Sequence, residues 1–166
     1  MWFELRKEDL SFARRAPLVH SVEFIVATPR AAVFAVISDP TTWKDWFPGV
    51  RAASYAGDAP RGVGTVRRAH VGNTHWEEEM IAWQPDECWA YTIVRSTVPM
   101  AKAQIEAFEF SDADGATRVR WTLALEPRLL ARLGSPFLPR VVGRLFVRAM
   151  QNLERYTQTA AADSKA

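Results

Sequence analysis

The strongest constraint on the fold is a run of six strand-like segments followed by one long amphipathic segment. Between Gly49 and Glu126, short stretches of alternating apolar and polar residues are separated by turn-forming residues. Period-two alternation is typical of strands with one buried face, and clusters of Gly, Pro, Asn and Asp mark turns. The segments predict a meander of antiparallel strands near 50–55, 62–71, 74–83, 88–95, 100–110 and 116–126.

A seventh strand and two short helices precede this meander. Residues 19–27 alternate between apolar and polar side chains, which predicts a strand. Thr28 can cap a helix and Pro29 suits its first position, so a helix is predicted over 29–39. A second short helical segment is predicted over 41–46.

A long helix is predicted from Arg128 to about Thr159, where apolar residues return every three or four positions. Pro136 and Pro139 are expected to bend or restart this helix near its beginning. We therefore predict an α+β fold, in which the long C-terminal helix covers a curved antiparallel sheet of about seven strands. The apolar face of the helix comprises Leu130, Leu133, Phe137, Leu138, Val141, Val142, Leu145, Phe146, Met150 and Leu153.

The size of the chain, 166 residues, fits one domain. Hydrophobic residues make up 48% and charged residues 24%, which is ordinary for a globular protein and excludes a disordered chain. No stretch approaches the roughly 18 uncharged apolar residues that a membrane-spanning helix needs. We expect an N-terminal extension over 1–16, a folded domain over 17–160 and a disordered tail over 161–166.

Charge and cysteine content exclude several classes of function. The net charge of +2 is too small to indicate a nucleic-acid binder, and no recognition motif accompanies it. Acidic residues interrupt any apolar signal-peptide core near the N-terminus, so the expected setting is the cytoplasm. The lone Cys88 excludes an intrachain disulfide, and without an obvious activating base it is expected to be inert and buried.

A set of residues early in the chain and at two later turns carries a family resemblance. It comprises Pro29, Val33, Phe34, Ile37, Asp39, Pro40, Trp43, Trp46 and Pro48, then Trp83-Gln84-Pro85 and the segment Gly115 to Val119. With the order of elements, it resembles the SRPBCC superfamily, the START-like and Bet v 1-like helix-grip group, nearest the polyketide cyclase/dehydrase branch. The resemblance implies a ligand cavity between the sheet and the long helix. It implies no universal catalytic motif.

Hairpin turns predict which residues face one another. With a two-residue turn at 72–73, Arg67 lies opposite Glu78 and Arg68 lies opposite Glu77. Each pair has opposite charges, so the register is electrostatically consistent. The next two hairpins are predicted to close at the pairs Trp83–Cys88 and Ser111–Ala116.

These registers divide the side chains between two faces of the sheet. The richer apolar face, which we assign inward, carries Met80, Trp89, Tyr91, Ile93, Phe108, Phe110, Val119, Trp121, Leu123 and Leu125. The same parity turns four polar residues inward, unless they lie at a wet cavity mouth or a bulge turns them outward: Arg67, Glu78, Gln104 and Glu106. Trp83 falls on the outward face unless a bulge lies near it.

The predicted ligand site combines apolar walls with a few polar groups. Its apolar members are Met80, Trp89, Tyr91, Phe108, Trp121, Leu145, Phe146 and Met150. The polar end of the ligand would be oriented by Arg67, Glu78, Gln104 or Glu106. An aromatic cluster at the cavity mouth is expected mainly to pack the open end of the fold and also to form an entrance lip. It comprises Trp43, Trp46 and Phe47.

Three functions follow as hypotheses. The first is a carrier or sensor that binds an apolar or aromatic small molecule, such as a lipid or polyketide. The second is a cyclase or dehydratase in which Arg67 or Tyr91 polarises a carbonyl, while Glu78 or Glu106 moves a proton. The third is an interaction module, with the oligomeric state open between monomer and homodimer. Its N-terminal extension would dock on a partner or a second copy, or pack equally on the protein's own surface, through Trp2, Phe3, Leu5, Leu10 and Phe12.

Three weaker motifs are interpreted as structural or solvent-exposed features rather than as functional sites. His70 and His75 could face one another as metal ligands, but Arg68 already pairs with the third candidate, Glu77, so we predict no metal and no cofactor. The glycines of 62–64 precede a strand rather than a helix, which indicates a bulge or a close backbone approach. Four arginines form a basic stripe on the predicted last helix: Arg140, Arg144, Arg148 and Arg155. We expect this stripe to be solvated, and the alternative is contact with an anionic membrane surface.

Overall fold

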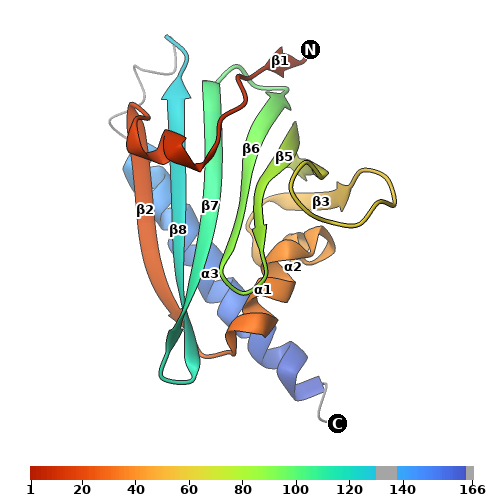
Figure 1. Cartoon of the computed structure of the whole chain (residues 1–166), viewed down its shortest axis with the longest axis vertical. Helices are drawn as coiled ribbons and strands as arrows, with labels where there is room; N and C mark the ends of the chain where they lie inside the picture. The colour runs from red at the N-terminus through yellow and green to blue at the C-terminus, as the bar shows by residue number, and fades with distance from the viewer. Residues whose placement is uncertain (130–137, 164–166) are drawn as a thin grey trace.

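The structure, a computed structural model, describes residues 1–129 and 138–163. Its framework is an antiparallel sheet of eight strands (Figure 1). Seven strands lie in the order β2-β8-β7-β6-β5-β4-β3, and β1 pairs with β6. The strands are β1 (Phe3–Glu4), β2 (Leu18–Val26), β3 (Val50–Tyr55), β4 (Val66–Val71), β5 (Thr74–Gln84), β6 (Cys88–Ser96), β7 (Ala101–Ala113) and β8 (Ala116–Pro127).

The helices confirm the predicted α+β architecture. The long helix α3 runs diagonally behind the sheet in the view of Figure 1, and α1 and α2 lie on the same side. A Cβ atom at Gly143 would lie 3.3 Å from His20 Nε2, so glycine lets α3 approach β2 closely. The helices are η1 (Leu10–Arg14), α1 (Arg30–Ser38), η2 (Pro40–Thr42), α2 (Trp43–Trp46) and α3 (Leu138–Asp163), where η denotes a 3-10 helix.

The inward face of the sheet is the one that parity predicts. All ten side chains assigned to it are buried and belong to a single apolar cluster. The cluster also takes in Phe146, Ala149, Met150 and Leu153 from α3. Burial of this much apolar surface is the main force that holds the helix against the sheet.

The first two hairpins confirm one predicted register and correct another. Arg67 pairs with Glu78 and Arg68 with Glu77, as expected from the turn at 72–73. The next hairpin closes one residue later than predicted, because Gln84 rather than Trp83 pairs with Cys88. A register shift between Met80 and Ala82 absorbs the difference and turns Trp83 toward the inner cluster.

The third hairpin closes two residues later than predicted. Ala113 pairs with Ala116 around a two-residue turn in which Asp114 and Gly115 both have positive φ, 50° and 87°. Such turns match the twist of the flanking strands and favour Asp-Gly. Because a shift of two residues preserves parity, the faces stay as predicted while Phe108 gains Trp121, not Val119, as its partner.

The predicted starts of β4 and α1 are wrong. Strand β4 begins at Val66 rather than at residue 62, because Gly64 has φ +87° and the Thr65 N–H bonds the Gly62 carbonyl. The glycines form a turn that leads into the predicted bulge. The Gly64 N–H bonds the Met80 carbonyl at 2.8 Å and the Met80 N–H bonds the Thr65 carbonyl at 2.9 Å, so two residues lie opposite one. Helix α1 begins at Arg30, and the hydroxyl of Thr28 bonds Thr157 at 3.0 Å instead of capping the helix.

The last helix begins later than its apolar pattern predicts. Arg128 is not helical, because its N–H continues the sheet by bonding the Met100 carbonyl at 3.0 Å. Helix α3 begins at Leu138 and continues through Asp163, three residues into the expected tail. Pro139 thus lies in its first turn, where proline is tolerated. The predictions for Leu130, Leu133, Pro136 and Phe137 and for the end of the tail lie outside the described residues.

The N-terminal extension is built into the sheet. Strands β6 and β7 pair from Cys88 to Thr92 and then separate, and the N-terminal segment enters the gap. The Leu5 N–H bonds the carbonyl of Val94 on β6 at 2.9 Å, and the Arg6 N–H bonds that of Lys102 on β7 at 2.8 Å. The side chain of Leu5 joins the inner apolar cluster.

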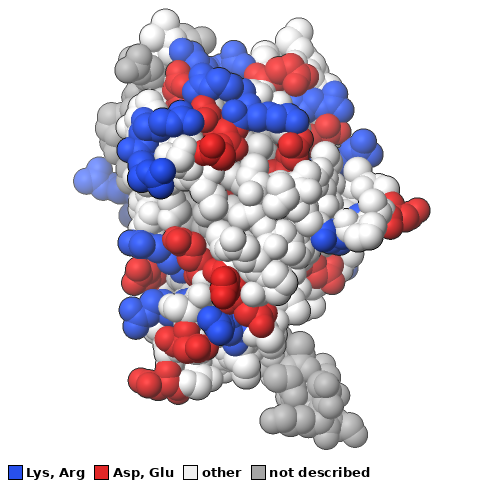
Figure 2. All heavy atoms as spheres, in the orientation of Figure 1, with Lys and Arg blue, Asp and Glu red and all other residues white. Residues whose placement is uncertain are grey.

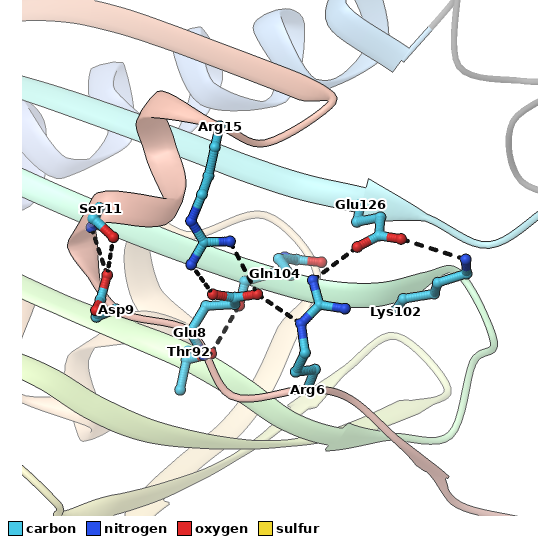
Figure 3. Close-up of polar contacts among 9 residues, drawn as sticks. All are labelled: Arg6, Glu8, Asp9, Ser11, Arg15, Thr92, Lys102, Gln104 and Glu126. Atoms are coloured by element: carbon cyan, nitrogen blue, oxygen red, sulfur yellow. Dashed lines mark hydrogen bonds and ion pairs between the residues drawn. The ribbon is translucent and has the colours of Figure 1, made fainter.

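Ion pairs fix this segment on the outer face of the sheet (Figure 3). Arg6 bonds Glu8 at 2.7 Å and Glu126 at 2.8 Å, and Glu8 also pairs with Arg15. Lys102 approaches Glu126 at 3.3 Å. The segment thus links β7 and β8 to η1 through alternating charges.

The outer face of the sheet carries both signs of charge. Lys and Arg are interleaved with Asp and Glu around the N-terminal segment and over β2 and β8, with an uncharged area between these regions (Figure 2). This face presents no continuous basic surface of the kind that binds nucleic acid. None of the described helices combines the length and apolar character needed to cross a membrane.

Candidate functional site

A cavity of about 150 Å³ lies between the inner face of the sheet, the end of α2 and the middle of α3. Five strands, β3 to β7, contribute to its wall, and α3 contributes Leu145. Most of the wall is apolar. The lining residues are Trp43, Phe47, Val50, Ala53, Arg67, Ala69, Val71, Trp76, Glu78, Tyr91, Ile93, Gln104, Glu106 and Leu145.

Arg67 is the central polar group of the cavity. The register of β4 and β5 turns it inward, where it is 1% exposed, and its Nε donates to Glu78 Oε2. Its guanidinium carbon lies 4.1 Å from the ring centre of Trp43, 4.9 Å from that of Trp89 and 4.7 Å from that of Tyr91. Aromatic faces attract cations, so these three rings form a cage that offsets part of the cost of burying the charge.

One end of this guanidinium has no partner among the described residues. Arg67 Nη1 is buried and makes no hydrogen bond, in contrast to Nε. A buried donor without a partner costs roughly 1–3 kcal/mol, and more when it is charged. Because Arg67 lines the cavity, an acceptor placed there would recover this energy.

Glu106 is the second ionisable group of the wall. Its Oε2 accepts from Trp121 Nε1 at 2.9 Å and its Oε1 from Gln104 Nε2 at 3.2 Å. Burial and the charge of Glu78 raise the pKa of Glu106 to about 7, against the hydrogen bond from Trp121. This carboxyl can therefore take up or release a proton near neutral pH.

The pKa values of two other groups at the site are also raised. Burial raises the pKa of Glu78, and Arg67 beside it opposes that shift. Burial and the nearby Glu106 raise the pKa of Tyr91 well above 10, so its hydroxyl stays neutral. The site therefore holds one guanidinium, two carboxyl groups and a phenol that serves as a hydrogen-bond donor.

The structure divides the predicted ligand residues between wall and core. On the wall are Arg67, Glu78, Tyr91, Gln104, Glu106 and Leu145, together with Trp43 and Phe47 of the predicted mouth. Buried beside the cavity rather than on its wall are Trp46, Met80, Trp89, Phe108, Trp121, Phe146 and Met150. These core residues pack tightly, with Trp121 stacked on Phe146 at a ring distance of 3.6 Å.

Sequence reasoning missed part of the wall: Val50, Ala53, Ala69, Val71 and Trp76, and it placed Ile93 inward without assigning it to the ligand. Trp76 was accessible to the parity argument, because it shares a strand and a face with Glu78. No sequence signal identifies Ala53 as a wall residue.

The remaining motifs lie away from this cavity. His70 and His75 stack with ring centres 4.3 Å apart in a surface depression that Trp2 also borders. The described residues contain no group of three or more His, Cys, Asp or Glu arranged to hold a metal. Burial raises the pKa of Cys88 to about 11, so its thiol stays protonated. Arg140, Arg144, Arg148 and Arg155 are exposed on α3.

A curved antiparallel sheet that grips a long C-terminal helix over a cavity defines the helix-grip class. The family model described as polyketide cyclase / dehydrase and lipid transport matches residues 19–158, and the chain belongs to this family. The match leaves out residues 1–18, which include β1 and the ion-paired residues Arg6, Glu8 and Arg15. A search of curated proteins gives no match.

Solved structures share the fold at low sequence identity. An aromatase/cyclase, Zhui, from a Streptomyces species has a TM-score of 0.70 and 21% identity over 85% of this chain and 94% of that one. A START superfamily protein from Mycobacterium smegmatis has a TM-score of 0.70 and 14% identity over 86% and 98%. The major latex-like protein 151 from Panax ginseng has a TM-score of 0.64 and 12% identity over 84% and 97%.

Proposed function

We propose that the chain binds an apolar or aromatic small molecule in the cavity, as a carrier or sensor. The observation that carries this proposal is the buried Arg67, which lines an apolar cavity and whose Nη1 has no hydrogen-bond partner among the described residues. Mostly apolar walls with a few placed polar groups are typical of small-molecule sites. The family to which the chain belongs includes lipid transport in its description, which supports the same class of function. A cytoplasmic setting and a choice between monomer and homodimer stay predictions.

The test fills the cavity from α3. Leu145→Trp places an indole in the cavity, and the control Val147→Trp adds the same side chain at an exposed position on the same helix. Three neutral probes, acetophenone, 1-decanol and 9-acetylanthracene, are titrated calorimetrically into each folded protein. At least one probe is expected to bind the original chain and the control but not Leu145→Trp. Equal binding by all three proteins, or no binding by any of them, would contradict the proposal.

A second candidate function is an enzyme of the cyclase or dehydratase type, which the protonation of Glu106 favours. A carboxyl with a pKa near 7 can act as acid or base at neutral pH. Arg67 or the neutral Tyr91 would polarise a carbonyl, and Glu106 or Glu78 would move a proton. The fold shared with an aromatase/cyclase is compatible with this chemistry but does not carry it.

The enzyme hypothesis predicts turnover of a polycarbonyl compound that depends on Glu106. The rate should change near pH 7, and Glu106→Gln should lower it by about a hundredfold or more. The control Glu109→Gln changes an exposed residue of the same strand and should leave the rate unchanged. Turnover that survives both Glu78→Gln and Glu106→Gln would remove these roles.

A further inference from the structure

We infer that the ligand of this cavity is a neutral compound of about one aromatic ring that carries an oxygen acceptor, such as an aryl ketone or a phenol. The inference rests on the proposed function and narrows it. It excludes free fatty acids and extended multi-ring compounds as ligands of this cavity. Size, charge and an unpartnered donor each support one part of it.

The size of the cavity limits the ligand to about one ring. An apolar cavity of roughly 150 Å³ accommodates benzene, and this cavity has about that volume. Space that a larger ligand would need is occupied by the protein's own aromatic residues. Trp121 stacks between Phe108 at 4.6 Å and Phe146 at 3.6 Å, and all three side chains are at most 3% exposed.

The charges on the wall disfavour an anionic ligand. Among the described lining residues, Arg67 is the one cation, and it faces two carboxyl groups, Glu78 and Glu106. The charge of Arg67 is already matched by Glu78, with which it forms an ion pair. A carboxylate or phosphate group would therefore add a net negative charge beside Glu106 in a poorly solvated site, which is unfavourable.

The unpartnered Nη1 of Arg67 identifies the polar group that the ligand brings. Only an acceptor can satisfy this donor, and a neutral carbonyl or hydroxyl oxygen does so without adding charge. The rings of Trp43 and Tyr91, which contact the same guanidinium and line the cavity, present flat surfaces to a planar ligand. A ring with an attached oxygen matches both features.

The experiment compares four ligands of defined shape by titration calorimetry on the unmodified chain. Acetophenone carries the ring and the oxygen, cumene has nearly the same shape without an oxygen, and benzoate has it with a negative charge. The fourth ligand, 9-acetylanthracene, keeps the acetyl group on three fused rings. Acetophenone is expected to bind at least about tenfold more tightly than cumene, since a hydrogen bond from a charged donor contributes that much. Benzoate and 9-acetylanthracene are also expected to bind at least about tenfold more weakly than acetophenone, the first because of its charge and the second because of its size.

Arg67→Lys tests the role of the donor, because lysine keeps the charge but lacks the guanidinium fork. Acetophenone should lose about tenfold or more in affinity, while cumene should keep its affinity. Retained folding is verified by circular dichroism, and the four-ligand comparison does not depend on this variant.

Three outcomes would overturn the inference. Benzoate or cumene binding as tightly as acetophenone would refute the charge or the acceptor argument. If 9-acetylanthracene or 1-decanol binds while acetophenone does not, the cavity binds ligands as proposed but the inferred class is wrong. If no probe binds and Leu145→Trp changes nothing, the proposed function fails together with the inference.

Discussion

Arg67 and Arg68 show how one step along a strand changes the energy of a charge. Both lie on β4 opposite a glutamate of β5, and both make an ion pair through Nε. Arg67 points into the cavity and is buried, whereas the side chain of Arg68 is 64% exposed. Desolvation is large for the first and small for the second, so the two pairs should respond differently to the loss of one member.

Arg67→Met is expected to lower the free energy of unfolding by about 3–5 kcal/mol, because it leaves Glu78 buried without its counter-charge. Arg68→Met, the matched control, should cost less than about 1 kcal/mol. Urea unfolding followed by tryptophan fluorescence measures both values. Equal effects of the two substitutions would show that the inward pair is hydrated like the outward one.

Glu106 should make stability depend on pH. Its pKa in the folded chain is about 7, against an ordinary value of 4.5, so the folded state binds the proton more tightly than the unfolded state. The contribution to stability is present below about pH 4.5 and is lost as pH rises through 7.

The stability of Glu106→Gln relative to the original chain should therefore increase by about 2–3 kcal/mol from pH 5 to pH 8. The measurement is urea unfolding at several pH values, and the difference between the two proteins removes the contribution of the histidines. Glu109→Gln, which removes an exposed carboxyl group of the same strand, is the control. A flat difference for Glu106→Gln would place its pKa near the ordinary value.

At the scale of elements, the N-terminal segment completes the sheet where β6 and β7 separate. It supplies backbone partners to Val94 and Lys102, and it inserts Leu5 into the inner cluster. The 3-10 helix η1 buries Phe12 against Ala103, Ile105 and Ala124 on the outer face. Leu5 and Phe12 were candidates for docking on a partner, and in the structure both side chains pack against the chain's own sheet.

Deletion of residues 1–8 should lower the free energy of unfolding by about 2–4 kcal/mol, because the carbonyls of Val94 and Lys102 lose their partners and the pocket of Leu5 empties. Arg6→Ala removes ion pairs of an exposed side chain and should cost less than about 1 kcal/mol. Thermal unfolding with light scattering measures stability and mass together. A change of mass on deletion, with stability unchanged, would support an interaction role instead.

At the scale of the whole molecule, aromatic side chains decide how much of the space under α3 remains for a ligand. Rings from α2, β6, β7, β8 and α3 contact one another in one continuous cluster: Trp43, Trp89, Phe108, Trp121 and Phe146. The open cavity lies against β3 to β7, and its wall includes two small residues of β3 and β4, Ala53 and Ala69. The same overall fold can therefore hold ligands of different size, according to which rings occupy the interior.

Patterns along the chain were enough to predict the fold class and the inward face, and their parity favoured an inward Arg67 and Glu78. Alternation along a strand is a local property, and an error of two residues in the register of Phe108 left its face unchanged. The partner of Phe108, the place of Leu5 and the presence of Ala53 on the cavity wall became known from the packed fold. Those features depend on how distant elements pack against one another, and the pattern within each element does not specify that packing.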